Sequence, residues 1–310
     1  MSSLLTFPGQ GSQRAGMLHD LPDHPVVAAT CAQASDVLGT DVLALDTAAR
    51  LRSTVAVQLC LLIAGVALSR CLAAEGARAG AVAGLSIGAY PAAVAAGVLP
   101  FADALRLVRA RAQWMEQAYP HGHGMTAILG LEAAALAPLI DRVRDSVGPV
   151  YLANLNAPTQ LVIAGALPAM EAVAALALEA GAQAARPIDI AVPSHCALLD
   201  DVAARLQRMG SRIAWSAPRL RYFSASAARE LRNASRIAED LLRNVAMPVR
   251  WHETMVLARA SDVGLVIEMP AGDVLTRLAG PVFGAAIAVS ADRTRLDSLV
   301  TLMRREADRH

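Results

Sequence analysis

The chain has 310 residues, 55% of them hydrophobic, and its formal net charge at pH 7 is +1. Its 28 basic residues balance 27 acidic ones without a run of either sign, which argues against a nucleic-acid-binding protein. The 28 basic residues are all arginine, so chemistry that needs a lysine Schiff base, a lysine general base or a P-loop lysine is excluded.

The length suits one large domain, or a large domain with a smaller insert. The longest apolar stretch, 55–68, is interrupted by Gln58 and is shorter than the roughly 20 residues that cross a bilayer. No charged segment followed by an apolar core opens the sequence, so we expect a cytoplasmic protein without a membrane partner. The four cysteines lack metal-like spacing and are expected to be reduced thiols.

The first predicted strand, 4–7, runs into the glycine-rich loop 8–13, where backbone N–H groups become available to a ligand. A phosphate cradle is not predicted there, because the loop lacks G-x-G-x-x-G and a lysine. Taken alone, the segment also fits an ordinary strand–loop junction. Helices are predicted over 26–38 and 53–74, the second capped by Ser53 or Thr54.

A short strand over 81–83 then leads into Gly-Leu-Ser-Ile-Gly at 84–88, a G-x-S-x-G pattern. Glycines two residues before and after Ser86 permit a sharp turn that exposes a serine hydroxyl, and a helix starting at Ile87 or Gly88 would favour developing negative charge. A tight turn without chemistry is the alternative interpretation. An amphipathic helix over 101–118 follows.

The pattern changes after residue 123. Six elements are predicted in the order βαββαβ, which is the ferredoxin-like arrangement: strand 125–129, helix 131–147, strands 150–154 and 160–165, helix 168–181 and strand 184–190. We expect residues 124–191 to form a small inserted subdomain, and residues 1–123 and 192–310 to form the core.

The remaining segment returns to alternating helices and strands. The predicted elements are helix 197–210, strand 220–224, helices 235–245 and 249–260, strand 264–269, helix 274–278, strand 287–290 and helix 293–307. This alternation predicts an α/β fold with a parallel sheet, whose functional residues lie at the carboxyl ends of the strands. Ser86 and the 8–13 loop both follow such ends.

His195, between a predicted strand and helix, is the best of the seven histidines to act as a base for Ser86; a loop histidine or a helix cap is the alternative. Arg111 lies 25 positions beyond the serine and could hold a carboxylate through two hydrogen bonds, or could simply be solvated. His121 and His123 have no third ligand at a convincing spacing, so no metal site is predicted.

Six segments in the same order resemble the malonyl-CoA:acyl carrier protein transacylase family over nearly the whole chain. They are Phe-Pro-Gly-Gln-Gly-Ser-Gln at 7–13, Gly-Leu-Ser-Ile-Gly at 84–88, Arg-Ala-Gln-Trp-Met at 111–115, Asn-Leu-Asn-Ala-Pro at 154–158 with Val-Ile-Ala-Gly at 162–165, Pro-Ser-His-Cys at 193–196 and Met-Pro-Val-Arg-Trp at 247–251. The resemblance implies an α/β-hydrolase-like core with a ferredoxin-like insert, in agreement with the elements predicted above.

The resemblance also implies roles for single residues. Ser86 would take the malonyl group as an ester, His195 would act as base and then acid, and Arg111 would bind the free carboxylate of the malonyl group. The backbone N–H groups of Gln10 and Ile87 would form the oxyanion hole. Three further residues, Gly9, Leu85 and Asn156, would line the pocket, and the backbone carbonyl of Arg250 would orient the histidine.

The resemblance further implies malonyl-CoA as substrate, the phosphopantetheine-type arm of an acyl carrier protein as acceptor, and no permanently bound cofactor. Leu85 and Ala89 depart from the usual Gly-His-Ser-x-Gly-Glu pattern. With Ile87 and Tyr90-Pro91 they resemble the acyltransferase (epsilon) subunit of malonate decarboxylase, and other subunits of that system would then be partners. The alternatives are the transacylase of fatty-acid synthesis, a serine thioesterase or hydrolase, and a non-catalytic carrier-docking subunit.

Overall fold

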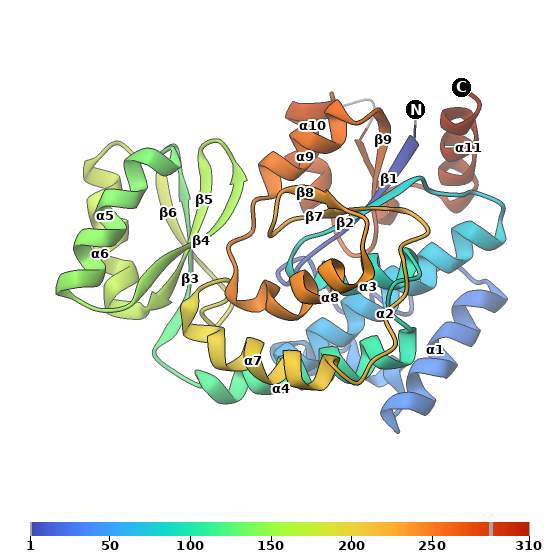
Figure 1. Cartoon of the computed structure of the whole chain (residues 1–310), viewed down its shortest axis with the longest axis horizontal. Coiled ribbons are helices and arrows are strands. Elements are labelled where there is room, and N and C mark those ends of the chain that lie inside the picture. The colour runs from blue at the N-terminus through green and yellow to red at the C-terminus, as the bar shows by residue number, and fades with distance from the viewer. Residues whose placement is uncertain (1, 285–287, 310) are drawn as a thin grey trace.

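A computed structural model describes residues 2–284 and 288–309 of the chain (Figure 1). Its larger sheet has the strand order β10-β9-β1-β2-β7-β8, in which every neighbouring pair is parallel except β7 and β8. The strands are β1 (Ser2–Phe7), β2 (Ala81–Gly84), β7 (Arg221–Ser224), β8 (Arg229–Leu231), β9 (Val263–Glu268) and β10 (Ala288–Ser290). The predicted parallel sheet is therefore confirmed.

Helices cover both faces of this sheet, because side chains of successive strand residues point to opposite faces. Leu5 and Phe7 of β1 pack into one apolar cluster, and Leu4 packs into another on the opposite face. The first cluster includes residues of α1 (Pro25–Leu38), α2 (Thr54–Ala74), α3 (Ala89–Ala95), α4 (Phe101–Ala118), α7 (Asp200–Gly210), α8 (Ala234–Arg243) and α11 (Leu296–Ala307). The second includes residues of α9 (Trp251–Ala260) and α10 (Val274–Phe283).

Helix α2 lies at the centre of the first cluster. Ser53 caps it by accepting a hydrogen bond from the Val55 N–H, as the sequence predicted. By length and composition α2 could cross a membrane, but 83% of its most apolar window is buried inside the protein. Its apolar character therefore reflects packing in the core.

The second sheet forms the separate lobe at the left of Figure 1, with α5 and α6 beside it. It is antiparallel, with the order β4-β5-β3-β6. Its elements follow the predicted βαββαβ sequence: β3 (His123–Leu129), α5 (Ala133–Ser146), β4 (Val150–Ala157), β5 (Gln160–Ala166), α6 (Leu167–Glu179) and β6 (Ala184–Ile188). The domain limits 124–191, 1–123 and 192–310 stay a prediction.

Strand β4 contacts the core through a bridge between Asn154 and Val249. The Leu155 N–H donates to the Val249 carbonyl at 2.7 Å, and the Val249 N–H donates to the Ala153 carbonyl at 2.8 Å. The smaller sheet is thus joined to the segment between α8 and α9.

Several elements differ from their predictions. The helix expected over 235–245 ends at Arg243 and continues as the 3-10 turn Asn244–Ala246, and α9 begins only at Trp251. Pro248 explains the interruption, because the residue before a proline disfavours helical backbone. The short strand β8 was not predicted, and of the last predicted strand, Ile287 lies outside the described residues.

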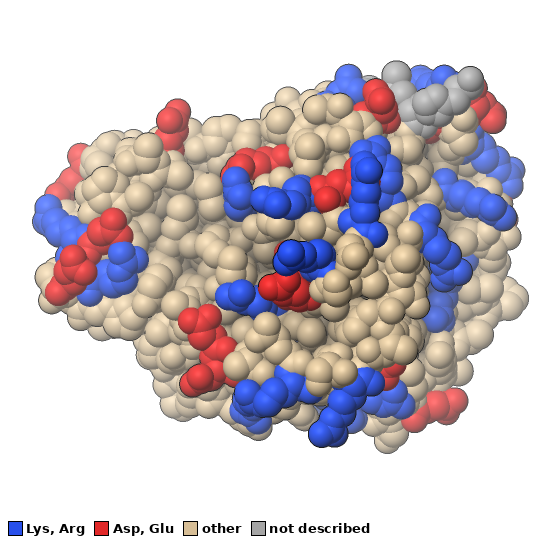
Figure 2. Space-filling model, in the orientation of Figure 1, with Lys and Arg blue, Asp and Glu red and all other residues tan. Residues whose placement is uncertain are grey.

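On the face shown in Figure 2, basic and acidic side chains are interspersed. No broad surface of one sign covers that face, in keeping with the nearly balanced charge of the chain.

Candidate active site

Ser86 lies directly after β2 on a strained turn. Its backbone φ of 57° is in the left-handed region, which non-glycine residues rarely adopt. The turn is crowded by backbone: a Cβ on Gly84 would lie 2.1 Å from the Gly88 carbonyl carbon, and one on Gly88 would lie 2.0 Å from the Phe7 oxygen. Only glycine fits at these two positions, so the G-x-S-x-G pattern here encodes a turn that leaves the Ser86 side chain partly exposed.

His195 is buried and meets the serine. Its Nε2 lies 2.7 Å from Ser86 Oγ. Its Nδ1 lies 2.8 Å from the carbonyl oxygen of Asn244 and 3.1 Å from that of Met247. Because carbonyl oxygens only accept, Nδ1 carries the proton and Nε2 is left free to accept the serine proton.

The prediction that the Arg250 carbonyl orients His195 is wrong. That carbonyl accepts hydrogen bonds from the N–H and Oγ1 of Thr254, at 3.1 Å and 2.8 Å, because Arg250 caps the start of α9. The Arg250 side chain pairs with Glu253 at the surface. The orienting carbonyls come instead from the 3-10 turn after α8 and from Met247.

Asn244 is a site residue that the sequence analysis missed. Besides its carbonyl contact with His195, its side-chain Nδ2 donates to the Ser86 carbonyl oxygen at 3.1 Å. The neighbouring Val245 carbonyl accepts from the His195 N–H at 2.8 Å, and His195 also has a positive φ of 65°. The 3-10 turn Asn244–Ala246 therefore forms hydrogen bonds with both residues of strained backbone, Ser86 and His195.

The environment of His195 keeps its imidazole neutral. Burial, followed by the nearby Arg111 guanidinium, lowers the pKa of His195 to about 4, against the opposing effect of the two carbonyls. At neutral pH the ring is therefore unprotonated and can act as a base.

Arg111 of α4 is fully buried beside the pair. Its Nη1 donates to Gln58 Oε1 at 2.6 Å, and its Nη2 donates to Ser86 Oγ at 3.3 Å. Within the described part of the chain, no carboxylate lies within ion-pair distance of this guanidinium, and its Nε has no partner. A buried cation without a counter-charge is costly, so the site is prepared for an anion that enters with the substrate.

The glycine-rich loop passes directly beside the serine. A Cβ on Gly9 would lie 2.7 Å from Leu85 Cδ2 and 3.6 Å from Ser86 Cβ, and Ser12 Oγ donates to the Gly9 carbonyl at 2.8 Å. The start of the loop, just before Gln10, therefore lies against the turn that carries Ser86 and Ile87. The role of the Gln10 and Ile87 backbones as an oxyanion hole stays a prediction.

Asn156 lies half-buried near the end of β4, where its Oδ1 accepts a 3.5 Å contact from Asn154 Nδ2. Its role in the pocket stays a prediction. His123 Nδ1 lies 3.1 Å from the His121 carbonyl oxygen, and the described residues hold no cluster of three or more potential metal ligands.

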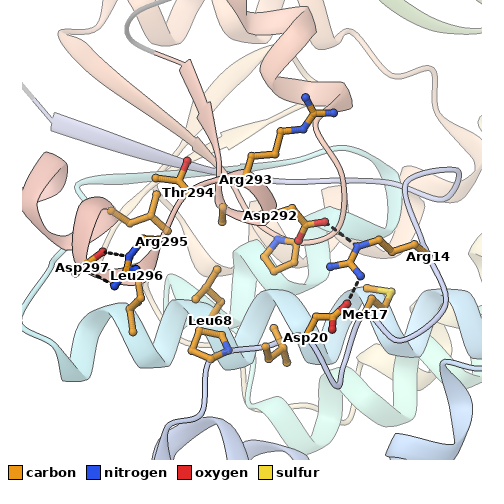
Figure 3. Close-up of a pocket in the computed structure, with 15 residues that line it drawn as sticks. Arg14, Met17, Asp20, Leu68, Asp292, Arg293, Thr294, Arg295, Leu296 and Asp297 are labelled. Carbon is orange, nitrogen blue, oxygen red and sulfur yellow. Dashed lines mark hydrogen bonds and ion pairs between the residues drawn. The ribbon is translucent and has the colours of Figure 1, made fainter.

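A separate cavity of about 830 Å³ opens at the carboxyl ends of β9 and β10 (Figure 3). Arg14 bridges Asp292 and Asp20 on its wall, and Arg295 pairs with Asp297. Because these guanidinium groups already have carboxylate partners, they differ from Arg111. The Arg14 bridge ties the glycine-rich loop region to the segment after β10.

A hydroxyl beside a neutral imidazole, on a strained turn after a parallel strand, is the arrangement of an enzyme that forms an acyl ester on serine. The family model described as "Acyl transferase domain" matches residues 5–308. The chain therefore belongs to the acyl transferase family.

Within that family the chain is similar to the malonyl CoA-acyl carrier protein transacylase of Escherichia coli K12, with 40% identity over 88% of this chain and 90% of the relative. The Bacillus subtilis transacylase is 35% identical over 88% and 87%. An acyl carrier protein S-malonyltransferase structure from Vibrio cholerae superposes with a TM-score of 0.91 at 36% identity, covering 97% of this chain and 100% of that one. A malonyl-transacylase in complex with a type II PKS acyl-carrier protein gives a TM-score of 0.91 at 36% identity, covering 98% and 100%.

Proposed function

We propose that the protein transfers the malonyl group of malonyl-CoA to the thiol of an acyl carrier protein through an ester on Ser86. The observation that carries the proposal is the 2.7 Å contact between Ser86 Oγ and His195 Nε2 with the buried Arg111 guanidinium beside it. The relatives named as malonyl CoA-acyl carrier protein transacylases support the choice of acyl donor and acceptor.

In the first half-reaction His195 Nε2 accepts the Ser86 proton while Oγ attacks the thioester carbonyl. The backbone N–H groups of Gln10 and Ile87 stabilise the oxyanion. The carbon–sulfur bond then breaks, and His195 returns the proton to the departing CoA thiolate. In the second half-reaction His195 takes the proton of the carrier thiol, the sulfur attacks the ester, and Ser86 Oγ leaves with that proton.

Arg111 binds the malonyl carboxylate throughout both steps. One carboxyl of the malonyl group forms the thioester with CoA. The other is a free carboxylate that takes no part in the reaction with Ser86 and keeps its negative charge. A guanidinium can hold such a carboxylate through two parallel hydrogen bonds.

The serine ester is tested by incubating the protein with radiolabelled malonyl-CoA in the absence of a carrier. The wild-type protein should retain one label, and Ser86→Ala should retain none, because the nucleophilic oxygen is gone. Label that persists on the Ser86→Ala protein would contradict the assignment. Rapid release of free malonate would instead indicate a thioesterase.

For the pathway, we propose transfer to the carrier protein of fatty-acid synthesis ahead of the malonate decarboxylase system. The relatives named above are transacylases, and Leu85 and Ala89 are the residues that favour the decarboxylase alternative. Offering carriers with phosphopantetheine and with phosphoribosyl-dephospho-CoA arms distinguishes the two. A strong preference for the phosphoribosyl-dephospho-CoA arm would favour the malonate decarboxylase system instead. Other subunits of that system would then be partners. The cytoplasmic location remains a prediction.

A further inference from the structure

Gln58 is a polar side chain in the middle of the buried, apolar helix α2. It is 1% exposed, and its neighbours in that helix are mostly Leu, Ile, Val and Ala. Burying an amide costs free energy unless its donors and acceptors find partners. A residue of this kind in the core therefore needs a reason beyond packing.

The partners of Gln58 lie on α4. Its Oε1 accepts from Arg111 Nη1 at 2.6 Å, and its Nε2 lies 3.5 Å from the sulfur of Met115, one helical turn after Arg111. The weak sulfur contact orients the amide so that its oxygen faces the guanidinium. With Nη1 held in this way, Nη2 reaches Ser86 Oγ at 3.3 Å.

The important feature of Gln58 is that its side chain is uncharged. An amide oxygen supplies a good acceptor without a negative charge. Gln58 thus fixes the direction of the Arg111 guanidinium but leaves its positive charge uncompensated, in a buried environment where electrostatic interactions are strong. A carboxylate at the same position would satisfy the same donor and neutralise the charge before substrate arrived.

We propose that Gln58 is a specificity-determining residue: as the neutral partner of Arg111, it reserves the guanidinium charge for the free carboxylate of a dicarboxylic acyl group. This inference rests on the proposed malonyl transfer. Two residues would then determine the preference for an acidic over a neutral acyl group: Arg111, which binds the carboxylate, and Gln58 on α2, which keeps the charge of Arg111 available.

The test compares kcat/KM for malonyl-CoA and acetyl-CoA with the same carrier, in the wild-type protein and in Gln58→Glu. The nearly isosteric glutamate should pair with Arg111 and repel the malonyl carboxylate. We expect the malonyl-to-acetyl ratio to fall by roughly 30-fold or more, the effect of losing a charge-assisted hydrogen bond. Acetyl transfer should fall much less, which also shows that the variant is folded.

Gln207→Glu, an exposed change of the same type on α7, is the matched control and should leave the ratio unaltered. If Gln58→Glu does not fold, Gln58→Met provides the second test, because methionine fills a similar volume without holding Nη1. Its KM for malonyl-CoA should rise while that for acetyl-CoA stays constant.

An unchanged ratio in folded Gln58→Glu, or an unchanged malonyl KM in Gln58→Met, would overturn the proposal. Failure of the wild-type protein itself to transfer malonyl is a different result and would contradict the proposed function.

Discussion

His195 and Arg111 show how two buried residues set each other's chemistry. The guanidinium that is placed for an acid substrate also lowers the pKa of His195, second only to burial among the causes. The base is therefore unprotonated far below the pH at which a free histidine would titrate. The positive charge of Arg111 therefore serves both the proposed selectivity for an acidic acyl group and the low pKa of His195.

Replacing Arg111 by methionine should separate these two effects. For the neutral donor acetyl-CoA, the acid limb of the kcat/KM profile should lie near pH 4 in the wild-type protein, because the pKa of His195 is about 4. Without the guanidinium this pKa rises, while burial still holds it below 6.5, so the limb should move to higher pH. Transfer of malonyl should also fall more than transfer of acetyl.

The measurement is the pH dependence of acetyl transfer between pH 4 and 8. Arg106→Met, at an arginine that pairs with Asp103 on the same helix, is the control and should keep the wild-type limb. An acid limb at the same pH in the wild-type and Arg111→Met proteins would show that the guanidinium does not tune the base.

At this scale the sequence was informative where a side chain performs the chemistry. Ser86, His195 and Arg111 come together as their motifs predicted, because each needs a particular side chain at a recognisable spacing. Asn244 and Gln58 escaped detection for physical reasons. A backbone carbonyl has no residue signature, and a single glutamine in an apolar helix reads only as an interruption.

At the scale of elements, the strained turn after β2 depends on the close approach of two backbones. The Gly88 Cα faces the carbonyl of Phe7 at the end of β1, and the Leu85 N–H donates to that same carbonyl at 3.0 Å. The turn with Ser86 and the start of the glycine-rich loop are thus held together by one contact.

Gly88→Ala should therefore damage both stability and activity. Its Cβ would lie 2.0 Å from a backbone oxygen that cannot rotate away, so we expect a loss of about 3 kcal/mol in unfolding free energy and almost no serine labelling. Urea denaturation and malonyl labelling measure the two effects.

Gly280→Ala in α10 is the matched control. A Cβ there meets nothing within 4 Å, so alanine should stabilise the helix by about 0.5–1 kcal/mol and leave labelling intact. Equal stability of the two variants would show that the tight approach at Gly88 is not a constraint.

Most helices and strands were predictable because their apolar residues either recur with one period or form an unbroken run between turn residues. The exceptions are short or interrupted. The three-residue strand β8 is too short to show an alternation, and α10 extends to Phe283 although Gly280-Pro281 resembles a stop signal. The missed turn Asn244–Ala246 was read as a continuation of the helix, and that error hid the carbonyl that orients His195.

At the scale of the whole molecule, the buried His195 and the half-buried Asp240 act on folding in opposite directions. Burial raises the pKa of Asp240 to about 6, and Ser224 Oγ donates to its Oδ1 at 2.7 Å. Between about pH 4 and 6 the folded protein keeps a proton on Asp240 that the unfolded chain has released, so this contribution to stability falls as the pH rises.

His195 has the opposite sign. Its pKa is lowered, so between about pH 4 and 6.5 the unfolded chain binds a proton that the folded protein does not, and this contribution rises with pH. Each slope is about 1.4 kcal/mol per pH unit at most, and over their shared range the two cancel.

Asp240→Asn should remove the contribution of Asp240 to the pH dependence of stability. Asparagine resembles the protonated acid and can still accept from Ser224, so the variant should match the wild-type protein near pH 4. Above pH 6 it should be more stable by about 3 kcal/mol, because the wild-type protein must then hold a deprotonated, charged carboxylate in a partly desolvated site. Urea denaturation at pH 4, 5, 6 and 7 measures the difference. Asp36→Asn, an exposed change on α1, should give a difference that does not grow with pH in this way. A constant difference in unfolding free energy between Asp240→Asn and wild type at all four pH values would contradict this prediction. It would mean that Asp240 does not offset the pH dependence of stability that His195 contributes.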